Sequence, residues 1–226
     1  MLDHGFDDKS VGAGWWNQRL ASLGLPQRFG PGEQAEQRRL TRRDLFQLAG
    51  PAAQNGASDD DVLMFLWHAL AWGTGSSQRG NDARVRAFAD PTDRQRNIAL
   101  LKQAMAFARA GDPAAAYRVL IRRGGGKIRG LGPAFFTKLL YFASEGAPGT
   151  RCLILDARVA GNLAEAGWSS LPRSNRTSYS YNWYTATYAS YCELLKRWAN
   201  EESERLSAHV WPDEIERALF QGHPNA

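Results

Sequence analysis

The chain has 226 residues, of which 43% are hydrophobic and 23% are charged, and its formal net charge is +5. This composition is too apolar for a disordered protein, and the length suffices for one sizeable core or for two small lobes that share a cleft. The surplus of positive charge is modest, so it indicates a polyanionic partner only if the basic residues cluster.

Residues that bind metals or cross membranes are scarce. The two cysteines exclude a four-thiolate zinc or iron–sulfur site, and the four histidines show no metal-ligand spacing. No apolar run approaches the roughly 20 residues of a membrane helix, and the first residues lack the pattern of a signal peptide. We therefore expect a soluble, cytoplasmic protein that binds no metal and no organic cofactor.

Helix-start signals come first in the chain. Thr41 and Asp44 have capping-box spacing, and Ser58 precedes three aspartates that suit the positive end of a helix dipole. From Val62 to Trp72 the sequence is apolar on nearly all sides, which predicts a buried central helix.

Further helices are predicted toward the C-terminus. A proline in the first helical position follows Asp90, Asp112 and Trp211. One later helix carries an apolar stripe at steps of three and four residues: Tyr184, Tyr188, Tyr191, Leu195 and Trp198. Only Cys152–Leu155 resembles a β-strand, and four residues make no sheet. The sequence predicts an all-α protein.

The positive charge is concentrated in the middle of the chain. Residues 113–144 contain six basic side chains and no acidic one, whereas residues 193–217 contain seven acidic and four basic side chains. The middle segment is therefore a candidate polyanion-binding surface, although a solvated helix face has the same composition.

A glycine-rich hairpin lies within this basic segment. Gly130 and Gly132 flank Leu131, and both glycines are free to take the positive φ of a tight turn while Leu131 plugs into the core. Pro133 would start the next helix, whose N-terminal N–H groups suit a phosphate. An ordinary turn between two packed helices would explain the same glycines.

The hairpin resembles the helix-hairpin-helix motif of DNA-binding proteins, which reads apolar-x-Gly-apolar-Gly before a helix. In this resemblance Lys127 and Arg129 would contact DNA phosphates beside Gly130, Leu131 and Gly132.

A candidate catalytic carboxylate follows the hairpin. Asp156 comes 24 residues after Gly132, at the end of a buried apolar run and before a helical pattern. This stretch is similar to the Val-Asp-x-x-Val segment of helix-hairpin-helix DNA glycosylases (the HhH-GPD superfamily), in which the Asp caps a helix and faces the scissile glycosidic bond. Alternatively, Asp156 caps a helix and does nothing else.

A candidate nucleophile lies between the hairpin and Asp156. Bifunctional members of the superfamily carry a lysine two residues after the second hairpin glycine, where this chain has Ala134. Lys138 lies one helical turn further on the same face, within an apolar stretch where burial would make its amine nucleophilic. The alternative is that Lys138 extends outward to solvent or phosphate.

The chain resembles in particular the compact, all-helical 8-oxoguanine DNA glycosylases (the OGG fold). The resemblance implies a six-helix lobe over residues 58–146 and a second lobe built from residues 1–57 and 147–226, with the active-site cleft between them. It also implies a monomer that excises a damaged base from double-stranded DNA.

The resemblance further implies the roles of individual residues. Lys138 would displace the base, Asp156 would stabilise the sugar cation, and the Schiff base would undergo β-elimination. Aromatic candidates for the base pocket are Trp72, Phe136 and Trp198, although a core role would explain each ring. Gln78 lies where related glycosylases have a turn that enters the duplex.

Two other functions stay open. Ala134 fits a monofunctional or catalytically silent helix-hairpin-helix protein that only binds DNA. The other possibility is a relative of this fold that acts on RNA or on a nucleotide in a phage-defence context.

Overall fold

The computed structural model describes residues 9–30, 37–121, 126–171 and 183–222. Helices dominate these ranges, and the sheet formed within them has two short antiparallel strands, with Ser10 opposite Arg39. The prediction of an all-α protein is confirmed. The elements in chain order are β1 (Lys9–Val11), α1 (Ala13–Ser22), β2 (Arg38–Leu40), α2 (Arg42–Ala52), α3 (Asp59–Thr74), α4 (Asn81–Arg86), α5 (Pro91–Arg109), α6 (Pro113–Leu120), α7 (Pro133–Ala143), α8 (Ala157–Glu165), α9 (Thr185–Leu206) and α10 (Pro212–Gln221).

The helices begin where the sequence predicts them to begin. The Thr41 hydroxyl accepts from the Asp44 N–H while the Asp44 carboxylate accepts from the Thr41 N–H, so the capping box is complete. Ser58 caps α3, and prolines occupy the first positions of α5, α6, α7 and α10. Helix α3 is buried on nearly all sides, as its apolar composition requires.

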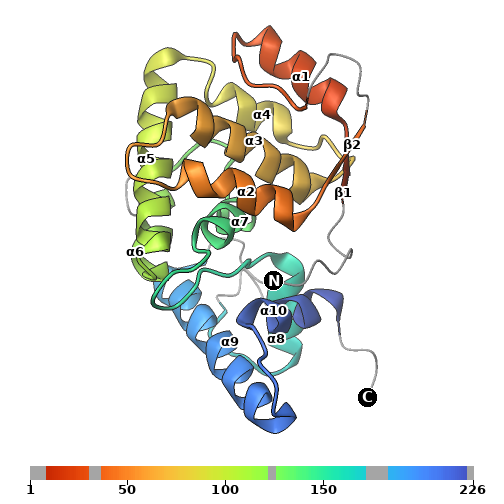
Figure 1. The fold of residues 1–226 in the computed structure, drawn as a ribbon, viewed down its shortest axis with the longest axis vertical. Helices are drawn as coiled ribbons and strands as arrows, with labels where there is room; N and C mark the ends of the chain where they lie inside the picture. Colours follow the sequence, from red (N-terminus) through yellow and green to blue (C-terminus); the bar gives the residue numbers. More distant parts are fainter. Residues whose placement is uncertain (1–8, 31–36, 122–125, 172–182, 223–226) are drawn as a thin grey trace.

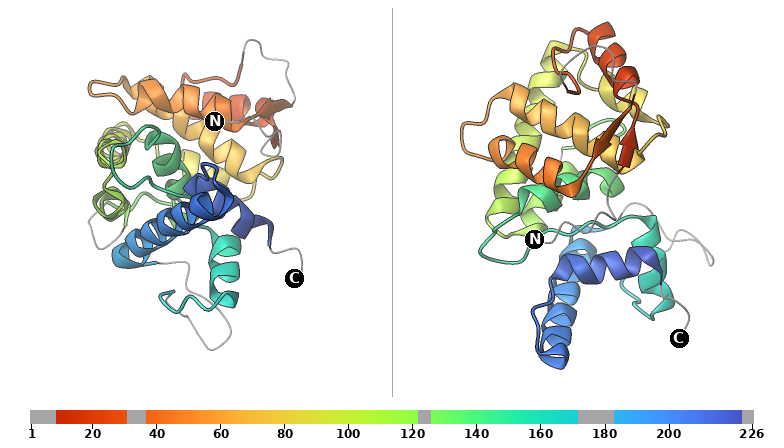
Figure 2. Two further views of the ribbon diagram at one scale, coloured as in Figure 1. Left: turned by 60° about the horizontal axis from the view of Figure 1, so that its bottom comes forward. Right: turned by 45° about the vertical axis from the view of Figure 1, so that its right-hand side comes forward.

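The helices form an upper and a lower group in Figure 1. Strand β1 packs on α3, α1 packs on α4, and α2 packs on both α3 and α7, so the N-terminal elements lie with the central helices. Helix α10 packs on α8 and α9, which lie below α7 in Figures 1 and 2. Five helices of the described residues lie within 58–146, and α2, which the prediction assigns to the second lobe, packs on two of them. The proposed division into domains stays a prediction.

Two local details differ from the sequence-based prediction. Tyr184 precedes α9 as its N-cap and is 49% exposed, whereas Tyr188, Tyr191 and Leu195 of the same stripe are buried. Gly130 takes a φ of +77°, but Gly132 has a φ of −83° and serves as the N-cap of α7. The hairpin therefore needs a positive φ at one of the two glycines.

Candidate active site

The hairpin leads directly into α7, most of whose residues are buried. Leu131 is buried, which confirms its predicted place in the core, and Lys127 and Arg129 are exposed on either side of the buried Ile128. Arg84 of α4 fixes the turn, because its Nε donates to the Gly130 carbonyl at 3.1 Å.

An extended segment, Cys152–Leu155, carries the chain from α7 to Asp156. It is not a β-strand, and side chains rather than a neighbouring strand satisfy its backbone. The Tyr188 and Tyr191 hydroxyls of α9 donate to the Leu153 and Ile154 carbonyls at 2.9 Å and 2.6 Å. The buried apolar segment is therefore held against α9 along its length.

Thr137 of α7 sets the position of this segment relative to the lysine. Its hydroxyl accepts from the Leu155 N–H at 3.3 Å and donates to the Pro133 carbonyl at 2.8 Å. Because Thr137 precedes Lys138 and Leu155 precedes Asp156, the contact places the two candidate catalytic residues side by side.

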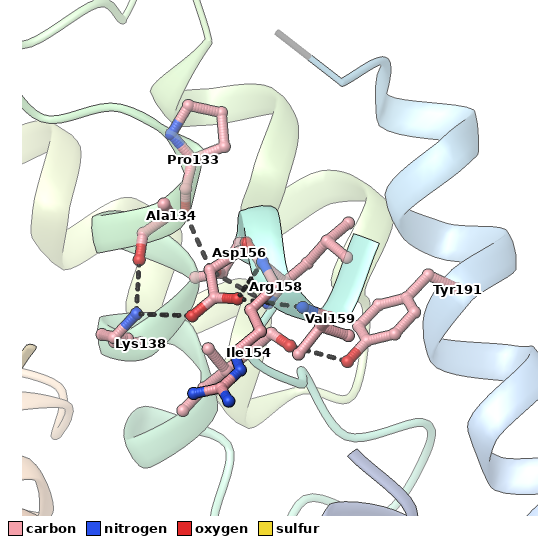
Figure 3. Close-up of polar contacts among 10 residues, drawn as sticks. Pro133, Ala134, Lys138, Ile154, Asp156, Arg158, Val159 and Tyr191 are labelled. Carbon is pink, nitrogen blue, oxygen red and sulfur yellow. Dashed lines mark hydrogen bonds and ion pairs between the residues drawn. The ribbon is translucent and has the colours of Figure 1, made fainter. Parts of the chain in front are cut away.

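Lys138 and Asp156 converge, as Figure 3 shows. The Lys138 Nζ lies 3.7 Å from the Asp156 Oδ2 and donates to the Ala134 carbonyl at 2.7 Å. Lys138 is only 8% exposed, and burial lowers the pKa of its amine while the Asp156 carboxylate opposes part of that shift. The amine therefore stays close to a fixed negative charge in a place that disfavours its own charge.

Asp156 has two functions in this geometry. Its Oδ1 accepts from the Arg158 and Val159 N–H groups at 3.0 Å and 3.1 Å, which caps α8. Its Oδ2 faces Lys138, so capping leaves the second oxygen available for the lysine. The Arg158 side chain is exposed beside this carboxylate.

Helix α3 leaves room for the lysine chain at Gly73. A Cβ at that position would lie 3.1 Å from the Lys138 Cδ and 3.3 Å from the Cε. These distances are tighter than nine in ten real Cβ contacts, so the absence of a side chain at Gly73 lets Lys138 cross α3.

A second group of charged residues adjoins the pair. Arg42 of α2 donates to the Tyr141 hydroxyl at 2.8 Å, and that hydroxyl donates to Asp213 of α10 at 2.7 Å. The Arg42 guanidinium also lies 5.6 Å from the ring centre of Trp72. Glu216, one turn after Asp213, is 2% exposed. Sequence reasoning missed Arg42, Asp213 and Glu216, because only the folding of α2 and α10 onto α7 brings them together.

The candidate pocket residues lie in different surroundings. Trp72 is nearly buried and borders the Arg42 group, whereas Phe136 is 1% exposed and packs edge-on against Tyr117. Trp198 is half-buried on α9, and Gln78 is exposed in the turn before α4. Of these residues, Trp72 is the one whose contacts connect it to the charged residues around Lys138.

The residues that the structure describes provide neither a cluster of metal ligands nor a membrane-spanning helix. No group of three or more His, Cys, Asp or Glu side chains in these ranges is placed to hold a metal ion. None of the helices seen there is both long and apolar enough to cross a membrane.

Comparison with known proteins identifies the family. The family model described as "Putative 8-oxoguanine DNA glycosylase OGG-like protein" matches residues 2–220. No curated protein and no solved structure matches the chain significantly. The match covers nearly the whole chain, so the protein belongs to the OGG-like family, and membership indicates a DNA glycosylase.

Proposed function

We propose that this member of the OGG-like family is a bifunctional glycosylase that removes an oxidised purine, such as 8-oxoguanine, from double-stranded DNA. The observation that carries the proposal is the buried Lys138 amine, 3.7 Å from the Asp156 carboxylate. A desolvated lysine is a usable nucleophile at neutral pH, and a fixed carboxylate stabilises positive charge on a neighbouring sugar.

The reaction divides between the two residues. With the damaged nucleotide rotated out of the duplex, the neutral Lys138 amine attacks C1′ and the bond from C1′ to the base breaks. The Asp156 carboxylate stabilises the cationic character that develops at C1′. The resulting imine between Lys138 and the opened sugar permits β-elimination of the 3′ phosphate, which is the lyase step.

In this proposal the hairpin binds the DNA backbone. Lys127 and Arg129 are exposed next to the glycine turn, and the N-terminus of α7 offers N–H groups to a phosphate. Gln78 would fill the space of the extruded nucleotide, and Trp72 would form part of the base pocket. The protein would act as a monomer.

Borohydride trapping tests the proposal. Wild-type protein should form a covalent adduct with duplexes that contain 8-oxoguanine or an abasic site, and none with the undamaged duplex. Lys138→Gln should abolish the adduct, whereas Lys102→Gln, which changes a lysine paired with Asp59 on the protein surface, should not. No adduct from the wild-type protein on either substrate would contradict the proposal.

Asp156→Asn separates the two functions of that residue. Asparagine caps helices about as well as aspartate, so α8 should persist while the negative charge is lost. Single-turnover base release should fall about 100-fold, with little change in thermal stability. Unchanged base release would mean that Asp156 is a helix cap alone.

The alternative is a DNA-binding protein without lyase chemistry, and Ala134 at the usual lysine position favours it. Base release without a trapped adduct would indicate a monofunctional glycosylase. Salt-sensitive DNA binding with neither base release nor an adduct would indicate a catalytically silent protein.

A further inference from the structure

Glu216 is a buried acid that the proposed reaction leaves without a function. It is 2% exposed, and its Oε2 is fully buried without a hydrogen-bond partner among the described residues. A buried oxygen of this kind costs free energy unless a substrate, a water or a chemical step uses it. Helix α10 therefore carries an acid that its own packing does not explain.

A contact between α7 and α10 brings Glu216 into the surroundings of Lys138. Lys138 and Tyr141 lie three residues apart on one face of α7, and Asp213 and Glu216 lie three residues apart on one face of α10. The Tyr141 hydroxyl donates to Asp213 at 2.7 Å, which joins one residue of each pair. Glu216 lies one turn from Asp213 on α10, and it is close enough to Lys138 that each of the two groups affects the pKa of the other electrostatically.

Burial favours the protonated form of Glu216. The pKa of Glu216 is raised to about 8: burial is the largest cause, Arg42 and Lys138 act against the rise, and Asp156 and Asp213 contribute to it. Within the described residues, the neutral hydroxyls of Tyr141 on α7 and Tyr191 on α9 also interact with Glu216, and burial raises the pKa values of both. At neutral pH Glu216 is therefore mainly a neutral carboxylic acid, which is able to donate a proton.

We propose that Glu216 is the proton donor of the Lys138 reaction, acting directly or through one water. This role rests on the proposed function, and it assigns to α10 the acid that lysine chemistry requires. When the Lys138 amine adds to the aldehyde of an abasic sugar, it forms a carbinolamine. The C–O bond of the carbinolamine then breaks, the departing hydroxyl takes the Glu216 proton and leaves as water, and a protonated imine and the Glu216 carboxylate remain.

Protonated Glu216 also serves the departing base when the protein excises a damaged base. As the bond from C1′ to the base breaks, the base takes the electron pair and the Glu216 proton, and it leaves neutral. Solvent then reprotonates Glu216. An acid with a pKa near the working pH is the most effective donor for such a step.

The test compares pH profiles of single-turnover borohydride trapping on an abasic-site duplex for wild type, Glu216→Gln and Glu216→Asp. The trapping rate of the wild-type protein should rise with pH as Lys138 loses its proton, and it should fall above about pH 8 as Glu216 ionises. Glu216→Gln should trap about 100-fold more slowly at the optimum and lose the descending limb. Glu216→Asp keeps a carboxyl group, so it should keep that limb at a lower rate.

Several outcomes overturn the inference. A Glu216→Gln profile parallel to that of wild type, or a variant that traps as fast, overturns the role of Glu216 and leaves the proposed function intact. Wild-type protein that traps no DNA at any pH overturns both. Infrared spectroscopy adds a measurement on the free protein: the carbonyl band of a buried protonated acid should disappear in Glu216→Gln, and its presence in that variant would also overturn the inference.

Discussion

Helix α3 borders two buried titratable groups that differ in their surroundings. His68, on α3 itself, is 2% exposed and stacks on Phe29 with a ring separation of 4.1 Å, while its Nδ1 lies 2.8 Å from the Met64 carbonyl. Lys138 crosses α3 at Gly73 and lies beside Asp156, Glu216 and Arg42. Burial lowers the pKa of both groups, so the shift alone does not distinguish them.

The difference lies in what surrounds each group. An aromatic ring and a helix carbonyl hold His68 as a neutral part of the core, and the smaller effects of Arg38 and Asp44 on its pKa oppose each other. Lys138 has a fixed carboxylate, a second carboxyl group and a neighbouring hairpin, which together form a constellation for chemistry. We conclude that burial identifies candidates, whereas converging charges identify the site.

Among variants that test this comparison, Gly73→Ala should have the largest effect on trapping by Lys138. The added Cβ would displace the Lys138 chain without removing any functional group. Trapping should fall between about 10-fold and 100-fold, because small misplacements of a nucleophile are costly. Thermal stability should stay equal or rise by up to about 1 kcal/mol, because alanine favours a helix over glycine.

Gly50→Ala is the matched control for Gly73→Ala. Gly50 lies in α2, and a Cβ there meets no atom within 4 Å. Its trapping rate should equal that of wild type. Equal trapping by both variants would show that Lys138 does not depend on the space at Gly73.

Replacement of His68 should change the stability of the fold and leave the rate of trapping unchanged. Its folded pKa is about 4, below the ordinary 6.5, because burial disfavours the imidazolium. Between those values the unfolded state binds the extra proton, so stability is fully present above about pH 6.5 and declines as the pH falls toward 4. The loss amounts to up to about 3 kcal/mol.

His68→Gln should flatten this part of the pH profile of stability. Urea unfolding at pH 7, 5.5 and 4.5 measures it, and trapping per folded molecule at pH 7.5 should match wild type. If the variant keeps the wild-type slope, His68 is not the group responsible.

The smallest effect should come from an exposed cation of the hairpin. Arg129→Ala should weaken DNA binding severalfold on damaged and undamaged duplexes alike. The slope of log binding constant against log salt concentration should become shallower by about 1, as expected for the loss of one phosphate contact. Single-turnover trapping at saturating protein should not change. An unaltered salt slope would show that Arg129 does not contact a phosphate, and a loss specific to damaged DNA would assign it to the base pocket.

The sequence predicted the parts of the fold that depend on local chemistry. The caps at Thr41, Ser58 and Asp156 need only residues within three positions of each other, and all three are present. Strands β1 and β2 were missed because three-residue strands carry no alternating pattern. Cys152–Leu155 looked like a strand because it is buried and extended, but tyrosines of α9 satisfy its carbonyls.

Some residues of the candidate site could likewise be predicted from the sequence, and others could not. The convergence of Lys138 with Asp156 was expected from the resemblance to helix-hairpin-helix glycosylases, together with the helix phase that places Lys138 one turn after Ala134. Contacts between α2, α7 and α10 bring Arg42, Asp213 and Glu216 close to Lys138. No local sequence pattern predicts such contacts between distant helices. The one available signal for Glu216 was an acid one turn before Leu219, on the inward face of the last helix.

The most direct test of the central claim is to map the residue that forms the adduct. Wild-type protein would be trapped with borohydride on an abasic-site duplex, digested with nuclease and trypsin, and analysed by mass spectrometry. Because a modified lysine blocks tryptic cleavage, the adduct should lie on the peptide from Gly130 to Arg151, at Lys138. An adduct on Lys9, Lys102, Lys127, Lys196 or the N-terminal amine would contradict the assignment of Lys138 as the nucleophile.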